Sequence, residues 1–332
     1  MSTPFPHYQQ NTRTRYSLDN GGKSLSNRAA FILAWAGLRR QLIEARRDFA
    51  FAAVSSEGHG VTCLGVRHSP HKPMDLILGR HESCDFQLLG DLSIALRQLI
   101  IRVSSLEQLP FIQLIDLRTS SGLADEQGAP CATISSHGAI IARMGKWHVI
   151  GMHRALVNPS HSADEAFESV TAHVSSVGSV SVAANSRRPS VRPRLVLVDT
   201  MLGDCRTQLS PVVGTLTLNN VDLDSEDAVG SLILEHSSGD TCVRLTPSDL
   251  ACGALIGRYM RCQLPALLGE DCNSISRVHL CLLLDEHGLW AIDVASKNGS
   301  WVNDHPFRTL RLVGATSLSI ANVMTVRWIP AF

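Results

Sequence analysis

Short apolar segments with a two-residue period recur in two stretches of the chain, and turn-forming residues separate them. In the first stretch they begin at Phe51, Val61, Met74, Leu99 and Phe111. In the second stretch they begin at Arg194, Gly214, Ser231, Thr241, Ala254, Val278, Trp290, Ser300 and Met324. This pattern is typical of short β-strands, and neither stretch alternates strands with long helices. The chain is therefore predicted to be all-β, with one β-sandwich in each stretch.

The segments outside these stretches predict how the sandwiches are flanked and joined. Residues 1–24 are polar and predict a flexible tail. Residues 25–50 carry apolar side chains mostly three and four positions apart, from Phe31 to Ile43, which predicts an amphipathic helix. Two roles are open for this helix, packing against the sandwich that follows or binding a partner. Residues 154–193 are rich in Ser, Val, Ala, Asn and Pro and predict a flexible linker.

Three motifs follow one another in the second stretch. They are Ile256-Gly257-Arg258, then Ser274-Ile-Ser-Arg-Val-His279-Leu280, then Asp293-Val-Ala-Ser-Lys-Asn298-Gly299-Ser300-Trp301-Val302-Asn303. Together they resemble the forkhead-associated (FHA) family, whose pattern is a GR pair, then S-x-x-H, then D-x-x-S-x-N-G-T-x-V-N-G. Two positions depart from it, because Ser300 replaces the usual threonine and Asn303-Asp304 replaces the usual Asn-Gly. The resemblance predicts an FHA domain within residues 194–332, with extra strands leading into it.

The resemblance also implies that the second stretch binds phosphothreonine peptides. A phosphate monoester carries close to two negative charges and three acceptor oxygens, so its site needs cationic, hydroxyl and amide donors that converge from loops. By resemblance, Arg258 and Ser276 contact the phosphate and Asn298 holds the peptide backbone. The residues implied to contact the phosphopeptide are Arg258, Ser276, Arg277, Lys297, Asn298 and Ser300. The residues implied to support the loops are Gly257, His279, Asp293 and Gly299.

Residues 51–153 repeat the same plan with a diverged site. The pair Gly79-Arg80 matches Gly257-Arg258, and Asp116 and Gly122 match Asp293 and Gly299. The positions of Ser276, Arg277, His279 and Asn298 are taken by Ala95, Leu96, Gln98 and Ser121. An arginine without its hydroxyl and amide partners should bind phosphate poorly. The fold class predicted is thus two FHA-type sandwiches joined by a flexible linker, with a short N-terminal helix, in which the first sandwich has become a docking or dimerisation surface.

Composition narrows the functional classes. The chain has 332 residues, and Lys plus Arg equals Asp plus Glu at 30 each, so its charge gives no case for nucleic-acid binding. The nine cysteines form no CxxC pair and fit reduced thiols. The longest apolar run, residues 29–38, is too short to span a membrane, and residues 1–20 lack the apolar core of a signal peptide. A cytoplasmic protein is expected.

The leading hypothesis is a phosphothreonine-binding adaptor or scaffold in Ser/Thr-kinase-dependent signalling or assembly, whose partner is a phosphothreonine protein or a Ser/Thr kinase. The alternative is a phosphate-independent packing module that uses the same fold, with self-association through the first sandwich or the helix. No GxSxG, HExxH, P-loop or kinase motif occurs, so an enzyme is not expected. No cofactor or metal is expected either, because the histidines of one turn-rich stretch are better explained as loop residues. They are His59, His68, His71 and His81.

Overall fold

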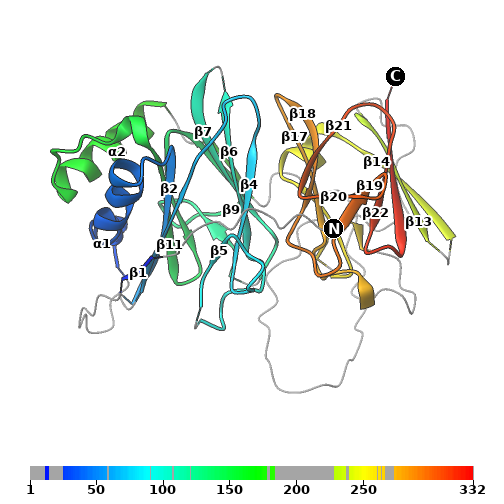
Figure 1. Cartoon of the computed structure of the whole chain (residues 1–332), viewed down its shortest axis with the longest axis horizontal. Coiled ribbons are helices and arrows are strands. Elements are labelled where there is room, and N and C mark those ends of the chain that lie inside the picture. The colour runs from blue at the N-terminus through cyan, green and yellow to red at the C-terminus, as the bar shows by residue number, and fades with distance from the viewer. Residues whose placement is uncertain are drawn as a thin grey trace.

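The computed structural model shows two β-sandwiches packed side by side, with helices on the far side of the first (Figure 1). The structure describes residues 12–14, 25–57, 60–89, 91–106, 108–119, 121–177, 180–183, 228–236, 239–259, 261–262, 264–265 and 273–331. The prediction of an all-β chain with two sandwiches is confirmed. The strands expected to begin at Arg194 and Gly214 lie outside the described residues.

The first sandwich is a continuous sheet that folds around its own core. Its strand order is β3-β2-β11-β10-β8-β9-β7-β6-β4-β5, with β1 beside β3 and β12 beside β9. Side chains such as Phe51, Leu78 and Ile101 alternate into this core. The strands are β1 (Thr12–Thr14), β2 (Phe49–Ser55), β3 (Val61–Val66), β4 (Met74–Gly79), β5 (Phe86–Gln87), β6 (Leu99–Leu106), β7 (Leu109–Asp116), β8 (Leu123–Ala124), β9 (Pro130–His137), β10 (Ala139–Met144), β11 (Trp147–His153) and β12 (Val180–Ala183).

Two helices cover one face of the first sandwich. Helix α1 (Asn27–Arg39) is capped by the Ser26 side chain and continues as a π-helical turn over Arg40–Glu44. Helix α2 (Ala163–Val177) packs beside α1, and both contribute apolar side chains to one buried cluster. Helix α1 contacts β2, β3 and β11, and α2 contacts β9 and β10. The N-terminal helix therefore packs on the sandwich that follows it, which was one of its two expected roles. It ends at Glu44 and not near residue 50, because β2 already begins at Phe49.

A flexible linker was predicted over 154–193 and a flexible tail over 1–24, and the structure has regular elements at the parts of these ranges that it describes. Residues 1–11, 15–24, 178–179 and 184–193 lie outside the described residues. A 3-10 turn (Arg154–Leu156), α2 and β12 all lie within 154–193. Burial of Ala166, Val170 and Val174 explains α2, because these four-residue steps place three apolar side chains on one helix face. Within the tail, β1 pairs antiparallel with β3.

The second sandwich consists of two sheets around a separate core. The strand order is β16-β15-β17-β18-β21 in one sheet and β14-β13-β23-β22-β19-β20 in the other. The strands are β13 (Gly230–His236), β14 (Gly239–Leu245), β15 (Ala254–Gly257), β16 (Leu264–Pro265), β17 (Leu280–Asp285), β18 (Gly288–Asp293), β19 (Ser300–Val302), β20 (His305–Phe307), β21 (Thr309–Leu312), β22 (Thr316–Ile320) and β23 (Met324–Pro330). The short helix α3 (Pro247–Ala251) starts with a capping box between Thr246 and Asp249.

The backbone of the first sandwich repeats that of the second. Strand β4 pairs in parallel with β5 and antiparallel with β6, as β15 does with β16 and β17. The loop hydrogen bonds also correspond: the amide of Arg80 donates to the carbonyl of Ala95, and the amide of Arg258 donates to that of Ser276. Leu117 and Val294 donate in the same way to Gln98 and His279. The internal repeat predicted from the motifs is thus present in the hydrogen-bond pattern.

The two sandwiches bury an apolar cluster between them. Strands β4, β6 and β7 face β15, β17 and β18, and each strand also points alternate side chains into its own core. Trp290 and Leu283 of the second sandwich pack in this cluster with Ile77 and Ile100 of the first. The first sandwich is therefore covered on both outer faces, by helices on one side and by the second sandwich on the other.

A buried ionic network lies in the same interface. The Arg102 guanidinium contacts Asp75 of its own sandwich at 2.8 Å and Asp285 of the second sandwich at 2.8 Å. It also lies over the Trp290 ring, 4.9 Å from the centroid. Thr309 donates to Asp75 from the second sandwich at 2.9 Å. Because the side chains of Arg102 and Asp75 are only 2% and 0% exposed, each charge depends on the other, and Asp285 and Thr309 extend this network to the second sandwich.

Candidate functional site

The three motifs of the second sandwich lie on loops that meet at one end of it. The first loop follows β15 and starts with Gly257 and Arg258. A Cβ on Gly257 would collide with the carbonyl oxygen of Arg277 on the second loop, so only glycine permits this approach. The amides of Arg258 and Tyr259 then donate to the carbonyls of Ser276 and Arg277, at 3.2 and 3.0 Å. The first two loops are therefore fixed to each other through their backbones.

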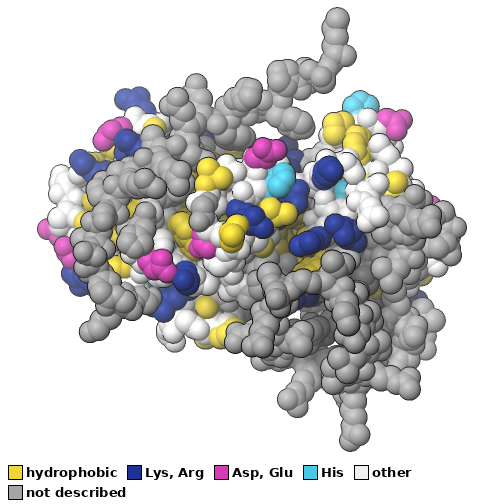
Figure 2. Space-filling model, turned by 90° about the horizontal axis from the view of Figure 1, so that it is seen from below, with side chains coloured by type: hydrophobic (Ala, Val, Ile, Leu, Met, Phe, Trp, Pro, Cys, Tyr) yellow, Lys and Arg dark blue, Asp and Glu magenta, His cyan; other side chains and the backbone are white. Residues whose placement is uncertain are grey.

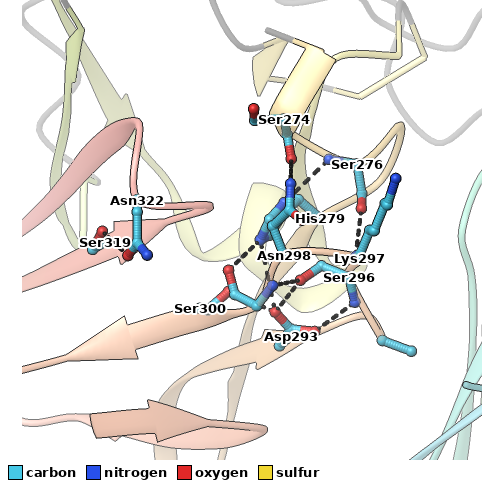
Figure 3. Close-up of polar contacts among 12 residues, drawn as sticks. Ser274, Ser276, His279, Asp293, Ser296, Lys297, Asn298, Ser300, Ser319 and Asn322 are labelled. Carbon is cyan, nitrogen blue, oxygen red and sulfur yellow. Dashed lines mark hydrogen bonds and ion pairs between the residues drawn. The ribbon is translucent and has the colours of Figure 1, made fainter. Parts of the chain in front are cut away.

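Ser276 joins the second loop to the third. Its Oγ accepts a hydrogen bond from the Lys297 amide at 3.0 Å, and its side chain lies at the edge of the buried region, 9% exposed as a residue. Among the described residues this Oγ acts as an acceptor, and a hydroxyl can also donate one hydrogen. Figure 3 shows the Lys297 side chain rising beside Ser276.

Asn298 closes the third loop over the second. Its Nδ2 donates to the carbonyl of Ser274 at 2.7 Å, while the residue itself is exposed (Figure 3). Gly299 follows with a φ of 77°, a conformation that favours glycine. The side-chain carboxamide of Asn298 is thus held at the exposed rim by one hydrogen bond to the second loop.

His279 and Asp293 hold these loops from below. His279 is fully buried; its Nδ1 accepts from the Ser276 amide at 3.2 Å and its Nε2 donates to the Gly299 carbonyl at 2.9 Å. This arrangement requires a neutral ring with the hydrogen on Nε2, and burial correspondingly lowers the pKa of His279. Asp293 accepts from the Ser296 amide and hydroxyl at 2.7 and 2.6 Å. Both residues therefore bond to the loops from within the domain.

Ser300 does not lie with the exposed groups at the rim. It was predicted to contact phosphopeptide, but its residue is 1% exposed and its Oγ donates to Asp293 at 2.7 Å. The hydroxyl completes the set of donors around a buried carboxylate and supports the loop. The structure therefore places Ser300 with Asp293, Gly299 and His279 rather than with Ser276 and Asn298.

The exposed rim of the second sandwich is cationic. Arg258, Arg277 and Lys297 are all exposed and come from the three loops that meet there. In Figure 1 these loops lie at the lower side of the view, and Figure 2, seen from below, shows Lys and Arg side chains gathered near the middle of that face. Three positive charges beside a hydroxyl and a carboxamide form a donor set that suits a phosphate monoester.

The corresponding rim of the first sandwich keeps its supporting bonds with other side chains. Gln98 stands in for His279, because its Oε1 accepts from the Ala95 amide at 2.9 Å. Ser121 stands in for Asn298, because its Oγ donates to the Ser93 carbonyl at 2.7 Å. The ligand groups are not replaced: Ala95 has no hydroxyl and Leu96 has no charge. The first rim thus keeps the hydrogen bonds that hold its loops and lacks the hydroxyl of Ser276 and the charge of Arg277.

Sequence reasoning missed two features near the site. Arg97 of the first sandwich donates to the carbonyl of Ala295, two residues before Lys297. Its place in the repeat corresponds to Val278, so no motif pointed to it. Ser274 was noted only as the start of a motif, yet its carbonyl holds Asn298. Each contact joins two different loops. A sequence motif describes one loop, so it does not predict a contact between two of them.

Neither a metal-binding cluster nor a membrane-spanning helix occurs among the described residues. Across these ranges, no group of three or more His, Cys, Asp or Glu side chains could hold a metal ion. None of the helices in the described ranges is long and apolar enough to cross a membrane.

Comparison with known proteins gives one family match and several similar structures. Residues 254–319 match the model of the FHA domain, so the chain carries an FHA domain, which is a type of interaction module, at these residues. No curated protein matches the chain. Mycobacterium tuberculosis Rv1747 FHA-1 is 20% identical and covers 32% of this chain and 100% of its own, with a TM-score of 0.25. The FHA1 domain of yeast Rad53 is 16% identical and covers 33% of this chain and 82% of its own, with a TM-score of 0.27.

Proposed function

We propose that this protein is a phosphothreonine-peptide-binding adaptor or scaffold, and that its ligand binds at the rim of the second sandwich. The observation that carries the proposal is the convergence of three loops around Ser276. Its carbonyl accepts the Arg258 amide, its Oγ accepts the Lys297 amide, and the neighbouring Ser274 carbonyl holds Asn298. These contacts bring a guanidinium, an ammonium, a hydroxyl and a carboxamide to one rim, on a domain that matches the FHA family.

Each group has a separate task in this proposal. Arg258 and Lys297 supply the positive charge that balances a doubly charged phosphate, and Ser276 donates one hydroxyl hydrogen to it. Asn298 uses the polar atoms not bonded to Ser274 to hold the peptide backbone beside the phosphothreonine, which fixes the register of the peptide. Arg277 adds charge at the exposed edge, where it contacts flanking residues. Gly257, His279, Asp293, Gly299 and Ser300 keep the loops in place.

The test is a binding measurement with the full chain. The probe is a pool of fluorescent peptides with a central phosphothreonine and degenerate flanks, compared with the same pool unphosphorylated. Arg258→Ala should weaken binding of the phosphorylated pool at least about 30-fold, because a charge-assisted contact in a phosphate site contributes roughly 2 kcal/mol or more. The matched control is Arg244→Ala, which removes the same charge from an exposed position on β14 of the same sandwich and should leave binding unchanged.

The alternative function is a protein-protein packing module that has the same fold and binds its partners independently of phosphate. Burial of the first sandwich on both outer faces favours a packing role for that sandwich. The same experiment separates the two functions. Equal, phosphate-independent binding by wild type and Arg258→Ala would support the packing module and remove the phosphopeptide proposal.

A further inference from the structure

The loop that presents Lys297 and Asn298 is anchored by the other sandwich. Its second residue, Ala295, is 4% exposed and has a φ of 50°, a left-handed conformation that is unfavourable for alanine. The Ala295 carbonyl accepts a hydrogen bond from Arg97 Nε at 2.6 Å and another from Arg97 Nη2. Ser83 Oγ donates to the same oxygen at 3.4 Å. Both donor residues belong to the first sandwich.

The neighbouring bonds of the loop come from the second sandwich itself. Before Ala295, the Val294 amide donates to the His279 carbonyl at 2.9 Å. After it, Asp293 accepts from Ser296, and Ser276 accepts from the Lys297 amide. Ala295 is therefore the point at which the loop turns, and its buried carbonyl would lose a charged donor if Arg97 were removed. An unsatisfied buried carbonyl is costly, so the turn would relax and shift the residues that follow it.

A corresponding contact runs in the opposite direction. Arg261 Nη1 of the second sandwich donates to the Arg118 carbonyl of the first at 3.3 Å. Arg118 has the place of Ala295 in the repeat and also has a positive φ, 57°. Each sandwich thus holds the equivalent loop of its neighbour. The two loops differ in the side chains that they present. The loop after Ala295 presents Lys297 and Asn298, whereas the loop after Arg118 has Ser121 at the position of Asn298.

We propose that Arg97 is a positioning residue of the phosphothreonine site, so that the first sandwich is a working part of a site whose ligand groups all lie on the second. Arg97 fixes the Ala295 turn, and the turn fixes the Lys297 amide against Ser276 and the Asn298 carboxamide over Ser274. This inference rests on the proposed function. It explains why a sandwich that has lost its own ligand groups retains the loop geometry of the family: the loop before β6 carries the arginine that orients its neighbour.

The experiment compares three variants of the full chain. Arg97→Met keeps a long side chain and removes every donor. Arg97→Lys keeps the positive charge and a single donor nitrogen in place of the two that contact Ala295. His287→Ala is the matched control, because His287 Nε2 contacts the Ser105 carbonyl across the same interface at 3.1 Å, at the opposite end of β18 from the site. The probe is the phosphothreonine peptide pool described above. The second measurement is amide hydrogen exchange of residues 296–299 without peptide.

Arg97→Met should bind the pool about ten-fold more weakly than wild type, as expected for loss of a charge-assisted hydrogen bond that orders the loop. Arg97→Lys should recover part of this loss, and His287→Ala should bind as wild type does. Exchange at residues 296–299 should be about ten-fold faster in Arg97→Met and unchanged in His287→Ala. A general loss of stability would instead affect Arg97→Met and His287→Ala alike and would not be restored by lysine.

The outcomes separate this inference from the function on which it rests. Wild-type affinity together with wild-type exchange in Arg97→Met overturns the positioning role and leaves the phosphopeptide function intact. Absence of binding by wild type overturns the proposed function, and hydrogen exchange then decides the anchoring of the loop on its own. Faster exchange in Arg97→Met, restored by Arg97→Lys, supports the anchor; unchanged exchange overturns it.

Discussion

Ser276 and Ala95 occupy equivalent places in two loops whose backbones make the same hydrogen bonds. Around them, the hydrogen bonds that hold the loops are present even where the residues differ. Gln98 accepts a hydrogen bond from the Ala95 amide, as His279 does from the Ser276 amide in the other sandwich. The groups suited to a ligand do not survive, because a hydroxyl and a charge are absent from the first rim. Loop support needs only a donor or acceptor of suitable reach, so several residue types meet it. Phosphate binding needs charge and donors together, so its loss leaves the fold intact.

The two sandwiches also differ in what covers them. The first lies between the helices and the second sandwich, whereas, among the described residues, the apolar side chains of the sheet that contains β13, β22 and β23 pack on the core of the second sandwich. Burial on both faces places the charges of β4 and β6 inside the molecule, where each needs a partner. This comparison leads to predictions about the interface, about the equivalent aspartates and about the equivalent rims.

The largest effect is expected at the buried ion network of the interface. Arg102→Met should lower the free energy of unfolding by about 3–5 kcal/mol, because it leaves Asp75 buried without its cation and removes the contact to Asp285. Urea unfolding at pH 7 measures this loss. The matched control is Lys146→Met, which removes the cation of an ion pair whose side chains are 65% and 53% exposed, and should cost at most about 1 kcal/mol. Equal losses in the two variants would show that the network does not couple the sandwiches.

Much of the fold could be predicted from the sequence, while the interface could not. The short apolar segments between turns identified the main strands, such as β4, β6, β17 and β18, and the three motifs identified the second sandwich as an FHA-type fold. The sequence does contain an indication of the packing between the sandwiches, although the predictions above did not include it. Leu280–Leu284 is an unbroken apolar run, and a strand that is apolar on both faces is buried on both faces. Helix α2 was missed because a serine-rich composition hid the apolar positions of one helix face.

The second prediction compares Asp116 with Asp293. One carboxylate oxygen of Asp116 is buried without a hydrogen-bond partner among the described residues, and burial raises the pKa of Asp116 to about 7. Because this pKa lies above that of an unfolded aspartate, the stability that the group contributes is complete below about pH 4 and is lost as the pH rises to about 7. Asp116→Asn should remove this loss of stability at high pH, because the amide side chain does not ionise. The variant should match wild type near pH 4 and exceed it at pH 8 by at most about 4 kcal/mol, from the size of the pKa rise.

Asp293→Asn is the matched control for that variant and should have the opposite effect. Asp293 accepts from Ser296 and Ser300 at 2.6–2.7 Å, so an amide loses charge-assisted bonds and should destabilise the protein by about 1–3 kcal/mol at pH 8. The measurement is urea unfolding at several pH values. A pH profile that is the same for Asp116→Asn and wild type would refute the assignment of this titration to Asp116. One difference between the aspartates is a lost donor, since Leu123 stands in the repeat where Ser300 donates to Asp293 in the second sandwich.

The site shows a similar division between what the sequence could and could not predict. Gly257, Ser276, His279 and Asn298 lie in the loops where the motifs placed them, because each motif position is fixed by hydrogen bonds within the domain. Ser300 was assigned to the ligand, but burial directs its hydroxyl to Asp293. Arg97 could not be found at all. Its contact with Ala295 joins residues of different domains, and a pattern read within one domain contains no information about the other.

The smallest effect is expected when the ligand groups are returned to the first rim. Ala95→Ser, Leu96→Arg and Ser121→Asn together restore a hydroxyl, a charge and a carboxamide on loops that already have the backbone hydrogen bonds of a site. Gly79 and Arg80 are already present, and a Cβ on Gly79 would collide with the Leu96 carbonyl just as one on Gly257 would collide with that of Arg277. The substitutions are made in an Arg258→Ala background, so that the second rim contributes little to binding of the phosphothreonine peptide pool.

This triple variant should bind the phosphorylated pool about ten-fold more tightly than its Arg258→Ala parent, an effect of roughly 1.4 kcal/mol. The gain should be modest, because the second rim also has the exposed Lys297, whereas the first rim has Ser120 at the equivalent position of the repeat. Adding Arg80→Ala should abolish the gain, which ties it to the first rim. If the triple variant binds no better than its parent, the two rims differ in geometry as well as in side chains, and the preserved backbone hydrogen bonds are not sufficient to define a phosphate site.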